Sequence, residues 1–263
     1  MTEETRLPRR CGLLLRSRRQ VGEHHGKLIA VPKDNRRRRH EIFTGVEQGC
    51  FFSAASVGGS LNQLGVQWMT AGRGIVHEEF QSEEFSRKGG TFEMAQLWVN
   101  LRARDKGTKP RYQNLLRREI PIVALPENAG TVRVIAGEYG KGKGPARTFT
   151  PINLWDVSLQ AGKSAHLPLP NGHTSIFLVL SGQVTVHGTD VSEGSLAIFA
   201  RNGEFVALEA QSDAHLLLMD GEPLNEPVVG RGPFIMNTHA EIQHAFEDYQ
   251  LGRMGEIPAV RGR

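Results

Sequence analysis

The chain has 263 residues, of which 39% are hydrophobic, and it contains 30 glycines and 13 prolines. This length allows one large core or two modest ones, and the composition suits a turn-rich β protein better than a helical bundle. No apolar run approaches the roughly 18 residues of a membrane helix, and two cysteines are too few for a disulfide scaffold, so we expect a cytoplasmic protein with no membrane association.

The positive charge of the chain belongs to its first 64 residues. They hold 12 Lys and Arg against 6 Asp and Glu, or +6, whereas the other 199 residues hold 20 against 22, or −2, which together make the net charge of +4. We therefore expect no nucleic-acid binding from residues 65–263. Residues 1–64 show no sustained helical or strand period. Three interpretations are open for them: a poorly ordered basic leader, a nucleic-acid arm or localisation signal around the arginines at 36–39, or a segment translated out of its natural frame.

Residues 66–79 form an apolar run, interrupted by glycines, that closes on a His-x-Glu pair, His77 and Glu79. The segment 74–80 is predicted to be a short strand after a turn. Side chains two apart on a strand point to the same face, with Cα atoms roughly 6.6 Å apart. An imidazole and a carboxylate in these positions can converge on one divalent ion, so the pair is a candidate half of a metal site.

Further strands are predicted along the rest of the chain. Residues 91–101, 120–125 and 132–136 are β-rich, with a turn at 127–130, and residues 112–118 are predicted to form a short helical turn. From residue 152 onward, short apolar strands alternate with glycines, which is typical of a β-sandwich or barrel. These strands are predicted at 153–159, 166–169, 175–180, 183–186, 195–199, 204–208 and 215–219.

One longer helix is predicted near the end of the sequence. Thr238 and Glu241 have the spacing of a capping box, and Gly252 stands where a C′ glycine belongs. The apolar face of this helix is predicted to consist of Ile242, Phe246 and Tyr249.

From about residue 65 to residue 257 the chain resembles the pirin family of bicupin proteins, particularly its bacterial branch. The resemblance is carried by residues 66–80, 96–101, 109–113, 132–137, 148–153 and 232–238, in the family's order, whereas residues 1–64 do not match. It implies an all-β fold of two double-stranded β-helix (cupin) barrels, the N-terminal one incomplete here, with a C-terminal helix. We therefore expect an unassigned leader at 1–64, the remainder of the N-terminal cupin domain at 65–150, the C-terminal cupin domain at 151–236, and the helix and tail at 237–263.

The resemblance also implies a metal site. Family members hold an Fe(II)-type metal through three histidines and one glutamate, two of these from a His-Pro-His stretch on an early strand and two from a later His-x-Glu. His77 and Glu79 match the later pair and are the predicted ligands, with Glu79 also the predicted catalytic base. No His-Pro-His occurs in residues 1–64. Because two donors bind a divalent ion weakly, we expect an impaired centre in which metal occupancy is low.

Several other residues bear on this site. His24, His25 or His40 is a weaker candidate to complete the ligand set, and Gln96 either lines the pocket or is an ordinary strand residue. Iron is the metal that the resemblance implies, and the ligand types also suit Mn, Ni, Cu or Zn. The histidines of the second barrel lack the spacing of cupin ligands, so that barrel is expected to bind no metal and to serve as scaffold.

The function that the resemblance implies is that of an oxidoreductase similar to quercetin 2,3-dioxygenase, in which O₂ opens a metal-bound flavonol. A small aromatic, flavonol-like compound is then the expected substrate. Two alternatives are open: a non-enzymatic, metal-responsive regulatory or binding module that acts on a protein partner, and an inactive remnant.

Overall fold

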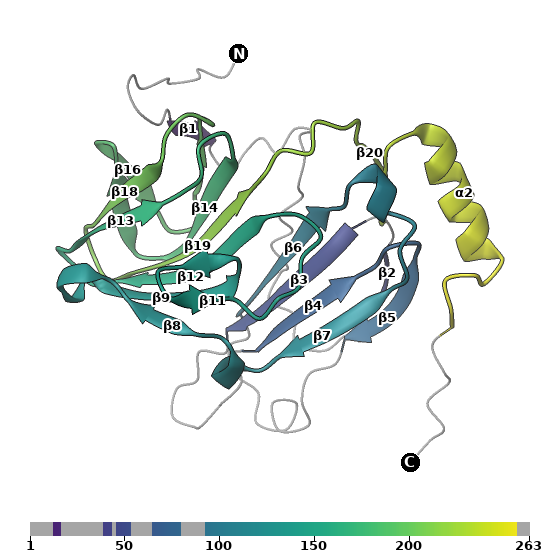
Figure 1. Ribbon diagram of the computed structural model, residues 1–263, viewed down its shortest axis with the longest axis horizontal. Helices are drawn as coiled ribbons and strands as arrows, with labels where there is room; N and C mark the ends of the chain where they lie inside the picture. The colour runs from purple at the N-terminus through teal and green to yellow at the C-terminus, as the bar shows by residue number, and fades with distance from the viewer. Residues whose placement is uncertain (1–12, 17–38, 44–45, 54–64, 80–92, 257–263) are drawn as a thin grey trace. The chain divides into compact units, whose positions relative to one another are not determined.

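The computed structural model describes the backbone of residues 13–16, 39–43, 46–53, 65–79 and 93–256, and the side chains of residues 65–77 and 95–256. The chain divides into two compact units, residues 1–23 with 118–223 and residues 24–117 with 224–263. Strands dominate both units, which confirms the predicted all-β class (Figure 1).

The unit made mainly of residues 118–223 contains two antiparallel sheets. The seven-stranded sheet has the order β1-β17-β14-β19-β12-β9-β8, and the four-stranded sheet has the order β13-β18-β15-β16. A small hairpin pairs β10 with β11. The strands are β1 (Leu13–Arg16), β8 (Ile122–Ala124), β9 (Gly130–Ala136), β10 (Glu138–Tyr139), β11 (Gly142–Lys143), β12 (Ile152–Leu159), β13 (Ser164–Pro168), β14 (Thr174–Ser181), β15 (Gln183–Val186), β16 (Thr189–Ser192), β17 (Leu196–Phe199), β18 (Phe205–Ala210) and β19 (Ala214–Gly221).

One apolar core lies between these two sheets. Burial alternates along the strands, as in β14, where Phe177 and Val179 are buried and the residues between them are only partly so. The inward side chains of both sheets belong to the same buried cluster, for example Trp155 from the larger sheet and Leu167 and Val206 from the smaller one. This arrangement follows from the period of two in the sequence, because every second side chain of a strand reaches the same face.

The second unit contains a four-stranded sheet of order β6-β3-β4-β7, the pairs β2-β5 and β20-β21, and the helix α2. All of its strand pairs are antiparallel. Its elements are β2 (Arg39–Phe43), β3 (Val46–Ser53), β4 (Val66–Thr70), β5 (Ile75–Glu79), β6 (Glu93–Asn100), β7 (Arg111–Leu115), β20 (Val229–Arg231), β21 (Phe234–Met236) and α2 (His239–Gln250).

Helix α2 begins with the predicted capping box. The Glu241 backbone N–H donates to Thr238 Oγ1 at 3.2 Å, and the Thr238 N–H donates to Glu241 Oε2 at 2.8 Å. The prediction of its apolar face was wrong for Tyr249, which is 42% exposed. The helix buries Ile242, as predicted, together with Ala245, and Phe246 packs partly buried on the same apolar cluster. That cluster consists of Phe234, Ile242, Ala245 and Met254.

The predicted helical turn at 112–118 was also wrong. Residues Arg111–Leu115 form β7, which pairs along its whole length with β4, and only Arg117–Glu119 form a turn of 3₁₀ helix. Pairing with a distant strand overrides a weak local preference of this kind. Among the residues described, no helix is both long and apolar enough to cross a bilayer.

Candidate metal centre

A tight turn over residues 71–74 places the strand that carries His77. The Gly74 N–H donates to the Ala71 carbonyl at 2.9 Å, and the Arg73 N–H donates to the Thr108 carbonyl at 2.9 Å. Gly72 has φ +53°, and a Cβ at that position would collide with the Thr108 carbonyl oxygen. The turn therefore depends on glycine, and β5 starts directly after it.

We expect Gly72→Ala to lower the free energy of unfolding by about 3 kcal/mol, because alanine adds both a left-handed backbone penalty and a backbone collision. Gly232→Ala is the matched control, since Gly232 has φ +59° with open space around it. It should lose only about 1 kcal/mol. Urea unfolding of both variants measures the difference, and equal losses would show that the Thr108 contact does not constrain the turn.

His77 lies on the face of β5 that meets an apolar cluster. Ile75, two residues before it, packs on the cluster of Met69 and Ala71, and so does Trp98. Val76 points the other way and packs on the cluster beneath α2. His77 and Glu79 are two and four residues after Ile75 on β5, so the period of two continues to predict one face for both. The His77 side chain is half-buried, and its Nε2 atom is fully buried.

The pairing of β5 with β2 determines which residues face this pair. Glu41 is the Cα partner of His77, and Arg39 is the Cα partner of Glu79. Directly opposed residues of antiparallel strands share one face, so these four positions form one cross-strand group. His40 is the Cα partner of Glu78, so its register position alternates with those of Arg39 and Glu41. His24 and His25 lie outside the described residues.

The residue types at these register positions differ from the three histidines and one glutamate that the family resemblance implies. Positions 77, 79 and 41 carry an imidazole and two carboxylates, which are suitable donors for a divalent ion. Position 39 carries a guanidinium, which has no lone pair to donate and repels a cation. Within the part of the chain that has described side chains, no group of three or more His, Cys, Asp or Glu could hold a metal ion.

Gln96 belongs to the same unit as His77. It is 3% exposed, on β6, two residues before Trp98, and Trp98 belongs to the apolar cluster that Ile75 also contacts. Side chains two apart on a strand share a face, so Gln96 is on the side of β6 that meets this cluster. This position is compatible with a polar wall residue, one of the two predictions made for it.

Lys106 is a buried lysine that the sequence did not single out. It is 4% exposed, and its Nζ donates to Asn100 Oδ1 at 2.5 Å and to the Ile235 carbonyl at 3.1 Å. Burial lowers the pKa of Lys106 to about 8, while the Glu226 and Glu241 carboxylates oppose that shift. A single lysine in a charged loop sequence looks solvated, so no local pattern could have revealed its burial.

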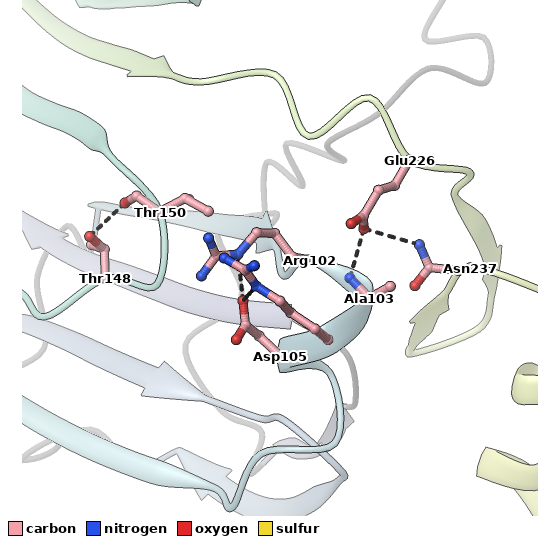
Figure 2. A network of polar contacts seen from close by, with 8 residues as sticks. Arg102, Ala103, Asp105, Thr148, Thr150, Glu226 and Asn237 are labelled. Carbon is pink, nitrogen blue, oxygen red and sulfur yellow. Dashed lines mark hydrogen bonds and ion pairs between the residues drawn. The ribbon is translucent and has the colours of Figure 1, made fainter.

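The segment around Lys106 is tied to the C-terminal part of the unit (Figure 2). Glu226 Oε2 accepts the Ala103 backbone N–H at 2.6 Å and lies 3.4 Å from Asn237 Nδ2. Arg102 Nε donates to Asp105 Oδ2 at 2.6 Å within the loop. These contacts and those of Lys106 fix the end of β6, the strand that carries Gln96 and Trp98.

Three of the four histidines of the other unit, all except His187, have a side-chain partner among the described residues. His166 stacks on Phe205 with ring centroids 5.4 Å apart, His215 bonds to Asp156, and His173 bonds to Asp220. Each side chain therefore has a local partner of its own rather than a shared point of convergence.

Comparison with protein families gives two matches. The pirin model matches residues 23–99, and the model of the pirin C-terminal cupin domain matches residues 154–255. The first match begins at residue 23. Residues 23–64, in which the sequence shows no motif of the family, therefore also align with it.

Individual relatives of the chain point to the same family. A Pseudomonas aeruginosa protein named as a candidate quercetin 2,3-dioxygenase is 46% identical over 90% of this chain and 79% of its own length. Human pirin is 38% identical over 75% of this chain and 67% of its own length. The crystal structure of a quercetin 2,3-dioxygenase from Acinetobacter baumannii has a TM-score of 0.76 and 38% identity, and the match covers 94% of this chain and 85% of that one.

Proposed function

This chain belongs to the pirin family of bicupin proteins, and from that premise we propose that it is an oxidoreductase of the quercetin 2,3-dioxygenase type with an impaired metal centre. The expected substrate is a small flavonol-like aromatic compound. The observation that supports the proposal is that His77 and Glu79 stand two residues apart on β5, the strand whose Ile75 packs on the apolar cluster of Met69 and Ala71. The scarcity of cysteine supports a cytoplasmic location.

We assign metal ligation to His77 and Glu79, with Fe(II) or another divalent ion as the metal. Glu79 is also the residue to which we assign the removal of a proton from a substrate hydroxyl, because a carboxylate beside the substrate is suited to that role. We attribute the proposed impairment to the residue type at position 39, the Cα partner of Glu79, because an arginine offers no lone pair to a metal ion.

Oxygen consumption with quercetin and added Fe(II) tests this function. We expect slow, Fe(II)-dependent uptake of O₂ that falls in His77→Ala to the background of free Fe(II). His244→Ala is the matched control, because it removes an exposed histidine of α2 from the same unit and should leave the rate unchanged.

Two outcomes would overturn the proposal. The first is uptake of O₂ that is equal in the wild type and His77→Ala. The second is the absence of any turnover, combined with Fe(II)-dependent capture of a protein partner, which would favour the regulatory module.

A further inference from the structure

A row of polar side chains lies at the end of the core of the unit that contains residues 118–223. Asn153 on β12 and Ser175 on β14 are both Cα partners of Asp220 on β19, which lies between them. The three therefore face the same side of the sheet. Two residues further along the strands, Trp155 and Phe177 belong to the buried core, so the row forms the last layer of the interior.

The carboxylate of Asp220 is fully buried and fully hydrogen-bonded. Its Oδ1 accepts from Ser175 Oγ at 2.8 Å, and its Oδ2 accepts from Asn153 Nδ2 at 2.9 Å and lies 3.0 Å from His173 Nδ1. A buried carboxylate is costly unless donors surround it, and three donors meet this one. The scaffold role expected for the second barrel does not require a polar layer at the end of its core.

An open depression of about 330 Å³ lies beside this row. Its walls are mostly apolar, and its polar side chains are Asn153 and Glu138. The lining residues are Glu138, Asn153, Trp155, Pro168, Leu169 and Pro170. The Trp155 indole Nε1 is buried and meets no hydrogen-bond acceptor among the described residues. Leaving such a donor without an acceptor costs about 1–3 kcal/mol.

The backbone at Gly137 leaves room for the Asn153 side chain, which lines the depression. Gly137 has φ +75°, and a Cβ there would collide with Asn153 Oδ1. The approach lets the Glu138 N–H donate to Asn153 Oδ1 at 3.2 Å. The Asn153 amide therefore links the buried Asp220 with the backbone of Glu138, another lining residue, and it keeps one N–H and one lone pair for a ligand.

The charges around the depression favour a neutral ligand. Asp220 disfavours an anion beside it, and a cation would find the Asp220 carboxylate already occupied by three donors. Glu138 is itself paired with Lys143 at 3.1 Å. Walls of proline, leucine and tryptophan suit a flat apolar ring. A hydroxyl group on that ring can both donate to Asn153 Oδ1 and accept from the remaining N–H of the Asn153 amide.

We propose that this depression is a binding site for a small, neutral, single-ring phenol, in the unit that carries no part of the candidate metal centre. The proposal does not depend on the proposed oxygenase activity, because none of its residues belongs to β2 or β5.

Binding of catechol to EDTA-treated protein, followed by ligand-observed NMR, tests this site. We expect the wild type and His77→Ala to bind with the same affinity within twofold. Pro170→Trp fills the depression from an exposed position and should weaken binding at least tenfold. Glu193→Trp adds the same side chain at an exposed turn of the same unit and should change nothing.

The indole ¹H–¹⁵N resonance of Trp155, assigned with Trp155→Phe, gives a second measurement on unmodified protein and should shift on catechol binding. The proposal is overturned by either of two results. One is binding that Pro170→Trp retains and His77→Ala loses. The other is the absence of a Trp155 shift at millimolar catechol.

Discussion

The double substitution Arg39→His with Glu41→His is expected to raise the affinity for Fe(II) or Co(II) by about 100-fold or more. It places a His-x-His pair at the positions that face Glu79 and His77 in the register of β2 and β5. The cross-strand group then holds three imidazoles and one carboxylate, the set that the family resemblance implies, and the repelling guanidinium is gone. Competition with a metal-binding dye measures the affinity, and the absorption bands of Co(II) report the geometry of the ligands.

A single substitution on the same strand is the matched control. Ile42→His forms a His-x-His pair with His40, but at positions that pair with Val76 and Glu78 on the other face. It adds an imidazole to the same pair of strands, β2 and β5, without adding one to the cross-strand group. Its affinity for Fe(II) or Co(II) should therefore stay within about threefold of the wild type. If Ile42→His gains as much as the double variant, or if the double variant gains nothing, the assigned face is wrong.

Lys106→Met is expected to remove a pH dependence of stability that is worth about 3 kcal/mol. The pKa of Lys106 is about 8 in the folded chain, against an ordinary value of 10.5. Between these two values the unfolded chain still holds a proton that the folded chain has released. Stability therefore rises with pH across this window, and the cost of burying the ammonium is fully present below pH 8. Urea unfolding of wild type and variant at pH 7.5 and pH 9.5 measures the difference in slope.

The control for this experiment is Lys141→Met, which replaces an exposed lysine of the other unit. It should follow the wild-type pH profile, because an exposed ammonium stays hydrated in both states. Parallel profiles for the wild type and Lys106→Met would contradict the burial of a charged Lys106 between Asn100 and the Ile235 carbonyl.

The strands of the second barrel were predictable because local signals agree there. Apolar residues alternate with polar ones, and glycines stand between the strands. The period of two and the glycine turns therefore predict the same strands. The predicted segments 153–159, 175–180 and 183–186 fall within β12, β14 and β15. The start of α2 was equally accessible, since a capping box is a contact between residues three apart.

The features that were missed depend on distant residues. Arg111–Leu115 was not recognised as a strand, because only pairing with β4, some forty residues earlier, makes it one. His77 and Glu79 could be assigned to one face from their spacing alone. Their partners Glu41 and Arg39 could not, because the register of β2 against β5 joins segments with unrelated local patterns. Lys106 was missed for the same reason, since its neighbours Glu226 and Ile235 lie far along the chain.

The metal content of protein purified in the presence of Fe(II), measured per chain by mass spectrometry, tests the central claim most directly. An incomplete centre at His77 and Glu79 predicts well below one equivalent in the wild type, less still in His77→Ala, and no change in His244→Ala. One full equivalent in the wild type, or equal amounts in the wild type and His77→Ala, would contradict it.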